Sequence, residues 1–167
     1  MKTRYFKALA VLGLGTMALF LVGRGASAKA GDWDRDGRTL EGTWVVTITQ
    51  HACPSGPAIA PPFKSLLTFN AGGTMTETTD NPMFFPAFRG PGHGVWSHTG
   101  HHTYSADSIA FVTVNGVLAK TQTINQTIEI GDDPNQFTTT EASVQFFDPS
   151  GNLLVSGCAS AAGQRFE

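Results

Sequence analysis

Four histidines fall within ten positions of this chain, at His93, His98, His101 and His102. Imidazole is the commonest side-chain ligand of transition metals, and it also exchanges protons near neutral pH. Convergence on one ion would require a turn geometry that the sequence does not specify, and the next carboxylate along the chain is Asp107. Three interpretations stand: a metal site, His98 as an acid or base in a cavity, and polar residues around a hairpin turn. We favour the hairpin and assign no metal.

An aspartate-rich segment offers a second metal motif. Asp32, Asp34, Asp36 and Gly37 match positions 1, 3, 5 and 6 of a calcium-binding loop. Position 12 is Thr43, where such loops carry a bidentate glutamate, and no helix is expected to precede the loop. We therefore interpret residues 29–40 as an acidic flexible tail, and we predict no cofactor.

Motifs for nucleophilic, phosphoryl or nucleotide chemistry are missing from the sequence. It contains no Gly-x-Ser-x-Gly, no P-loop, no His-Glu-x-x-His and no dinucleotide-binding glycine pattern. No catalytic residue is assigned. An isomerase or cyclase, which needs few polar groups, would have to use residues such as His98 or Glu77.

One predicted loop, residues 81–92, combines three phenylalanines with three prolines: Phe84, Phe85, Phe88, Pro82, Pro86 and Pro91. Proline lowers the entropy cost of ordering a loop, and three phenyl rings are a large apolar surface. One interpretation is a lid that contacts an apolar ligand. The alternative is that the rings fill the core beneath a long loop.

The first residues are typical of an export signal. Lys2, Arg4 and Lys7 precede an apolar stretch over residues 8–23, and Ala26-Ser27-Ala28 offers a cleavage site. The stretch is short and glycine-rich for a membrane anchor. We predict a signal peptide over residues 1–28, a secreted or periplasmic location, and no membrane span after processing.

Removal of that signal would make the protein acidic. Residues 1–28 hold four of the 11 basic side chains and none of the 13 acidic ones, so the formal charge would change from −2 to −6. Such a surface repels phosphate backbones, which argues against nucleic acid as a partner. The remainder is the size of one domain, placed at residues 41–167, and its oligomeric state is not specified.

The two cysteines, Cys53 and Cys158, are predicted to form a disulfide, as export would allow. Closing a loop of 105 residues contributes about 4–5 kcal/mol in the chain-entropy model. A redox or metal pair is the alternative, but such pairs are usually closer in sequence.

The body of the chain alternates between strand-like runs and turns. Trp44, Val46 and Ile48 share one face of the first run, and Asn115-Gly116 is typical of a type I′ hairpin turn. The sequence predicts an all-β fold, a single eight-stranded antiparallel up-and-down barrel, with a two-sheet sandwich as the alternative. The expected strands are residues 43–50, 63–70, 74–79, 94–99, 102–114, 118–130, 136–147 and 152–157, the last continuing toward Phe166.

The two ends of this meander carry residues suited to meet. Trp44 follows Gly42 at the start and Arg165 stands near the end, so a guanidinium can lie over the indole, a contact of about 1 kcal/mol. If Cys53 lies opposite Cys158 on neighbouring strands, residue 44 lies opposite residue 167. We interpret Trp44 and Arg165 as a structural closure of the barrel.

Gly42-x-Trp44 and Arg165 on a secreted eight-strand meander resemble the lipocalin/calycin superfamily. The stretch Gly92–Trp96, with Thr99-Gly100 and Thr103-Tyr104, resembles small exported bacterial barrels of the lipocalin-like or allene-oxide-cyclase-like type. The Thr-Asp-Tyr-like turn of true lipocalins is missing. The resemblance implies a calycin-like barrel over about residues 40–166 and no transferable catalytic residue.

Three functions fit these features. The first is binding of a small hydrophobic ligand without catalysis. The second is a cyclase or isomerase acting on a lipophilic substrate, and the third is a ligand-free structural envelope protein. The predicted ligand-binding residues are Trp44, Trp96, Tyr104, His98, Phe84, Phe85 and Phe88.

Overall fold

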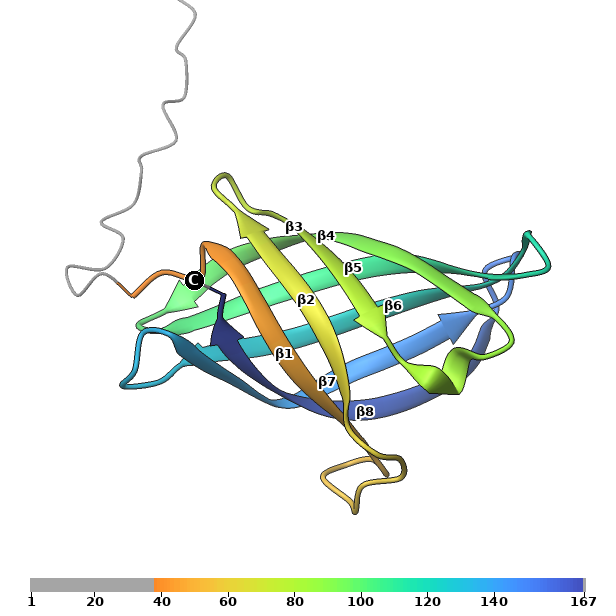
Figure 1. Ribbon diagram of the computed structural model, residues 1–167, viewed down its shortest axis with the longest axis horizontal. Coiled ribbons are helices and arrows are strands. Elements are labelled where there is room, and N and C mark those ends of the chain that lie inside the picture. The colour runs from red at the N-terminus through yellow and green to blue at the C-terminus, as the bar shows by residue number, and fades with distance from the viewer. Residues whose placement is uncertain (1–37, 167) are drawn as a thin grey trace, which may run out of the picture. The chain divides into compact units, whose positions relative to one another are not determined.

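A computed structural model of the protein describes residues 38–166. Eight antiparallel strands, each paired with its neighbours in sequence, close into one barrel in which β1 also pairs with β8 (Figure 1). The predicted fold class is therefore confirmed. The elements are β1 (Gly42–His51), β2 (Phe63–Asn70), β3 (Thr74–Asp80), the 3-10 helix η1 (Pro82–Phe84), β4 (Phe88–Gly100), β5 (Thr103–Val114), β6 (Val117–Ile130), β7 (Gln136–Phe147) and β8 (Leu153–Arg165).

Several predictions fall on segments outside the described residues. They are the signal peptide at residues 1–28, the Asp32–Asp34–Asp36 loop, and residues 29–37 of the predicted tail. No helix among residues 38–166 is long and apolar enough to cross a bilayer.

Strand alternation separates the interior of the barrel from its outer surface. Trp44 and Val46 are fully buried, while threonines that alternate with inward residues, such as Thr76 and Thr138, are exposed. The main core cluster lies in the half of the barrel where β1 begins and β8 ends. It consists of Leu40, Trp44, Val46, Leu67, Phe69, Met75, Tyr104, Ala106, Ile128, Ile130 and Phe137.

Strand β4 differs most from its prediction. It begins at Phe88 rather than at residue 94, because Arg89-Gly90-Pro91-Gly92 is part of the strand and not of a loop. Arg89 pairs with Val112 and Gly92 pairs with Ala110, so one extra residue forms a bulge on β4. The bulge allows both Arg89 and Gly92 to be buried, although an odd number of positions separates them.

The barrel closes where β1 and β8 meet. Trp44 is paired with Arg165, and the guanidinium carbon of Arg165 lies 4.2 Å from the indole centre. The contact between the two ends is therefore present, but the predicted register was wrong by two positions. Residue 158 lies opposite His51, because β1 ends there and Cys53 belongs to the loop that follows.

Gly42 is required at this junction for two reasons. Its φ of +122° lies in a region that favours glycine, and a Cβ atom there would lie 2.7 Å from a guanidinium nitrogen of Arg165. The Gly-x-Trp motif therefore provides both the backbone conformation and the space that the Arg165 side chain occupies.

Residues 38–41 lie against the end of the barrel that the main core cluster fills, which we call the closed end. Leu40 is fully buried, and its carbonyl accepts a hydrogen bond from Trp44 Nε1 at 2.9 Å. Tyr104 Oη donates to the Arg38 carbonyl at 3.0 Å. The last three residues of the predicted 29–40 tail are thus packed on the barrel, because the Leu40 side chain is buried there and the backbone carbonyls of Arg38 and Leu40 accept hydrogen bonds from it.

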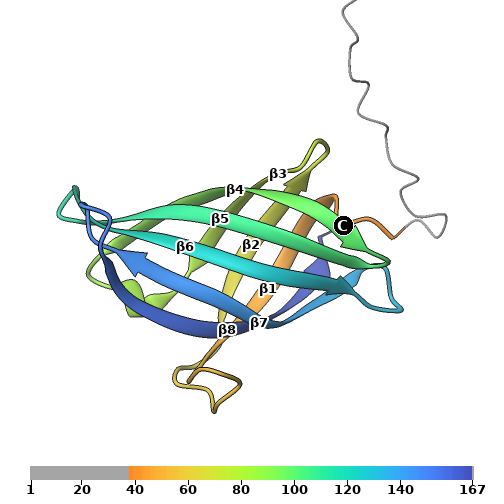
Figure 2. The same ribbon diagram turned by 180° about the vertical axis from the view of Figure 1, so that it is seen from behind.

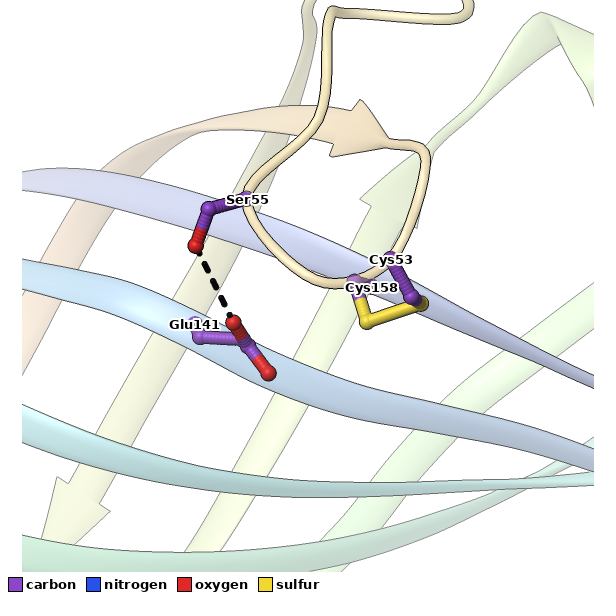
Figure 3. Close-up of a disulfide and its surroundings, with 4 residues drawn as sticks. All are labelled: Cys53, Ser55, Glu141 and Cys158. Atoms are coloured by element: carbon purple, nitrogen blue, oxygen red, sulfur yellow. Dashed lines mark hydrogen bonds between the residues drawn. A yellow bond between two sulfur atoms is a disulfide. The ribbon is translucent and has the colours of Figure 1, made fainter.

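The Cys53–Cys158 disulfide is confirmed, with Cα atoms 5.3 Å apart (Figure 3). It joins the β1–β2 loop to β8. Ser55 in the same loop donates a hydrogen bond of 3.3 Å to Glu141 on β7. The loop is therefore fastened to two neighbouring strands on the outside of the barrel.

Candidate functional site

A cavity of about 50 Å³ lies inside the barrel, beyond the closed-end core. The turn at residues 115–116 and the turn at residues 148–152 lie at the opposite end from the C-terminus (Figures 1 and 2). Phe63 at the start of β2 and Phe84 of η1 line the cavity, which places it toward that opposite end. The remaining lining residues are Val46, Ile48, Gln50, Leu67, Glu77, Thr79, Asn81, Arg89, Gln122, Ile124, Gln126, Ala142, Val144, Ala159, Ser160 and Ala161.

One wall of the cavity is apolar. It is formed by inward-facing residues of β1, β7 and β8, and the small side chains on β8 leave space in front of them. Ala142, Val144 and Ala159 form a second core cluster there, packed with Ile48 and Ile124. This wall can bind a hydrocarbon surface by dispersion and the hydrophobic effect.

The facing wall, formed by β3, β4 and β6, is polar. Glu77 and Arg89 form a buried ion pair there, with 3% and 2% of their side-chain surfaces exposed. Arg89 Nε also donates to the Gln122 side-chain oxygen, and Arg89 Nη1 donates to the Gly90 carbonyl at 3.2 Å. Burial lowers the pKa of Arg89 to about 10, so the guanidinium still carries its charge at neutral pH.

Small residues make this arrangement possible. Glu77 is paired with Gly92, and a Cβ atom at Gly92 would lie 2.4 Å from Glu77 Cγ. The space is therefore filled by the glutamate side chain. Arg89 on β4 reaches Gln122 on β6 across the intervening strand β5, whose buried residue at that level is Ala110.

The cavity lining contains a hydrogen-bond acceptor that the described residues do not use. Gln50 Oε1, at the end of β1, is buried and has no partner among residues 38–166. Glu77 and Gln50 both line the cavity, so this acceptor belongs to the same site as the ion pair.

The structure divides the sequence-predicted ligand residues between the two halves of the barrel. Phe84 lines the cavity and lies 6.2 Å from the ring of Phe146, whereas Phe85 and Phe88 are 87% and 67% exposed. The other four lie together in the closed half, where the aromatic rings contact one another. These are Trp44, Trp96, Tyr104 and His98. They are not part of the cavity lining, and their role in binding stays a prediction.

The histidines follow the hairpin between β4 and β5. His98 packs 5.0 Å from the ring of Tyr104, His101 and His102 occupy the turn, and His93 is exposed on the outer face of β4. Within the described part of the chain, no three His, Cys, Asp or Glu residues lie close enough to hold a metal ion. The hairpin interpretation agrees with this placement.

Sequence reasoning missed Arg89 and Gln122. Arg89 was included in a predicted loop because Gly90-Pro91-Gly92 is typical of a turn. The available signal was the alternation of side chains along the neighbouring strand. Met75, Glu77 and Thr79 occupy every second position, between exposed residues, so Glu77 faces the interior. A buried carboxylate needs a cation, and Arg89 is an arginine of the adjacent strand.

Comparisons with protein-family models, with curated proteins and with solved structures found no match to this chain.

Proposed function

We propose that this protein is an exported barrel that binds a small apolar molecule without changing it chemically. The observation that carries the proposal is the cavity, in which an apolar wall on β1, β7 and β8 faces a compact polar group. Ligand sites of proteins typically combine a hydrophobic lining with a few placed polar groups. A barrel whose interior were filled would have no such space.

Its size limits what the cavity can enclose. Pockets that enclose drug-sized ligands measure roughly 300–1,000 Å³. The volume of about 50 Å³ therefore suits a group of few non-hydrogen atoms, or one end of a longer molecule. Exposed apolar side chains such as Phe85, Phe88 and Met83 lie on the segment around η1, next to Phe84, and would contact any part that projects outward.

Two further features support export and ancestry. A disulfide between Cys53 and Cys158 suits an oxidising compartment, the periplasm or the outside of the cell. The up-and-down topology and the Trp44–Arg165 contact support a relationship to the lipocalin/calycin superfamily. Neither feature depends on the ligand.

The binding proposal is tested by titrating short aliphatic compounds into the purified, disulfide-bonded protein and following backbone amide signals by NMR. Shifts should concentrate at cavity residues such as Ile48, Val144 and Ala159. Replacing Ala161→Leu, which fills the cavity, should abolish them. Ala162→Leu is the matched control, because the side chain of Ala162, next to Ala161 on β8, is exposed on the outer face of the barrel. Absence of shifts with every compound would contradict the proposal.

A cyclase or isomerase is the second candidate, and one observation favours it. Glu77 and Arg89 are ionisable groups that line a cavity, a setting in which catalytic groups are common. Their mutual pairing favours a binding role instead, since the carboxylate is already neutralised. Conversion of a bound lipophilic substrate that is lost in Glu77→Gln would support the enzyme and overturn the binder.

A further inference from the structure

We propose that the cavity selects a neutral molecule with a single unbranched aliphatic chain, whose polar end is a hydroxyl group or another uncharged hydrogen-bond donor. This inference rests on the proposed binding function and names its ligand class. Three properties of the lining carry it: volume, charge balance and one unused acceptor.

Volume favours a chain over a ring. An engineered cavity of about 150 Å³ in another protein accommodates benzene. The cavity in this barrel measures about 50 Å³. A ring therefore does not fit without rearrangement of the tightly packed walls. An extended chain has a smaller cross-section, so one end of it can enter between Ile48, Ile124 and Val144 while the rest projects outward.

Charge balance favours a neutral head group. Glu77 and Arg89 carry opposite charges and are paired with each other, so the polar wall has no net charge. An incoming carboxylate would meet Glu77, and an incoming ammonium would meet Arg89. Either ion would lose its hydration shell without finding an opposite charge that is not already paired. The resulting desolvation cost is strongly unfavourable in a buried site.

The unused polar atom favours a donor. Gln50 Oε1 is buried, and it has no hydrogen-bond partner among residues 38–166. A buried acceptor without a donor costs stability, so a ligand that supplies an O–H recovers that cost on binding. An alkane has the right shape but leaves this acceptor unsatisfied.

The test uses five compounds of six carbons: 1-hexanol, hexane, hexanoate, hexylammonium and cyclohexanol, titrated at pH 7.5 and followed by NMR. We expect 1-hexanol to bind about tenfold or more tighter than either ion. It should also bind about two- to tenfold tighter than hexane, since one hydrogen bond is gained. Cyclohexanol should bind more weakly than 1-hexanol because of its cross-section.

The possible outcomes distinguish failure of the proposed ligand class from failure of the proposed binding function. Binding of hexanoate or hexylammonium as tightly as 1-hexanol overturns the neutral head group, and equal binding of cyclohexanol overturns the chain. Equal binding of hexane and 1-hexanol overturns the donor. If none of the five binds, including hexane, the proposed binding function itself fails.

A charge substitution provides the sharpest check. Glu77→Gln leaves Arg89 without its counter-ion, so hexanoate should gain about tenfold or more and overtake 1-hexanol. Glu129→Gln makes the same chemical change on the exposed face of β6 and should leave the order of affinities unchanged. An unchanged order in folded Glu77→Gln would overturn the role of the pair.

A second substitution serves if Glu77→Gln does not fold, as judged by circular dichroism. Gln50→Leu removes the unpartnered acceptor and leaves the ion pair intact. The preference for 1-hexanol over hexane should then fall several-fold. A preference equal to that of the unmodified protein would count against the acceptor argument.

Discussion

The guanidinium carbon of Arg165 lies 4.2 Å from the centre of the Trp44 indole, and the two residues are direct partners across the β1–β8 seam. Arg165 also donates to the carbonyls of Thr39 and Glu41, at 2.7 and 2.5 Å, and to Asn135 Oδ1 at 3.1 Å. One side chain therefore joins the last strand, the segment that enters the barrel, and the β6–β7 loop.

Replacing Arg165→Ala should lower the free energy of unfolding by about 2–4 kcal/mol, because it removes the cation–π contact and several charge-assisted hydrogen bonds. Urea unfolding followed by tryptophan fluorescence measures the change. Gln164→Ala, the exposed neighbour on β8, is the control and should change stability by less than about 0.5 kcal/mol. Equal effects of the two substitutions would show that the seam does not depend on Arg165.

Loss of the disulfide should reduce stability without opening the barrel. The double replacement Cys53→Ser, Cys158→Ser frees a loop of 105 residues, and we expect a loss of up to about 4–5 kcal/mol. Ser55→Ala removes a second contact of that loop, its exposed hydrogen bond to Glu141, and should cost little. Comparison of the urea midpoints of the three proteins checks both statements; a strong effect of Ser55→Ala would place the main tie elsewhere.

Gly92→Ala should disturb the polar wall. The added methyl would lie 2.4 Å from Glu77 Cγ, so the glutamate must move away from Arg89, at a cost of about 1–3 kcal/mol. Gly157→Ala is the matched strand control, since no atom lies within 4 Å of the corresponding position on β8. Thermal unfolding compares the two variants. We also expect only Gly92→Ala to weaken 1-hexanol binding.

Acidification should loosen the turn between β7 and β8. Side-chain and backbone hydrogen bonds from Asn152, together with those from Ser150 and Gly151, lower the pKa of Asp148 below its ordinary value of 3.8. Because the folded-state pKa is the lower one, the stabilisation is present above pH 3.8 and is lost as the pH falls through the folded-state value. Amide shifts of Ser150 and Asn152 should follow this titration, and Asp148→Asn should remove it.

Much of the barrel could be predicted because its information is local. Alternation placed Trp44, Val46 and Ile48 on one face, and Asn115-Gly116 marked a hairpin, as the structure confirms. Both signals depend on neighbouring residues only. The partnership of Cys53 with Cys158 could be inferred because there was no other cysteine to choose.

The cavity could not be predicted in the same way. Arg89 lies in a stretch that is typical of a turn, and only its pairing with β5 makes it a bulge that directs the side chain inward. The aromatic residues favoured as ligand contacts, such as Trp96 and Tyr104, pack in the closed half because the strand register places them there.

The sequence alone indicated eight strands, the alternation of faces, the disulfide, and the meeting of a glycine–tryptophan start with an arginine end, and it left the choice between a barrel and a sandwich open. These features follow from residue type and spacing along the chain. The tertiary structure alone decided which inward residues meet. The depth of each side chain depends on register and bulges summed around a closed sheet, so Glu77, Arg89 and Gln122 came together from three strands on one wall of a small cavity.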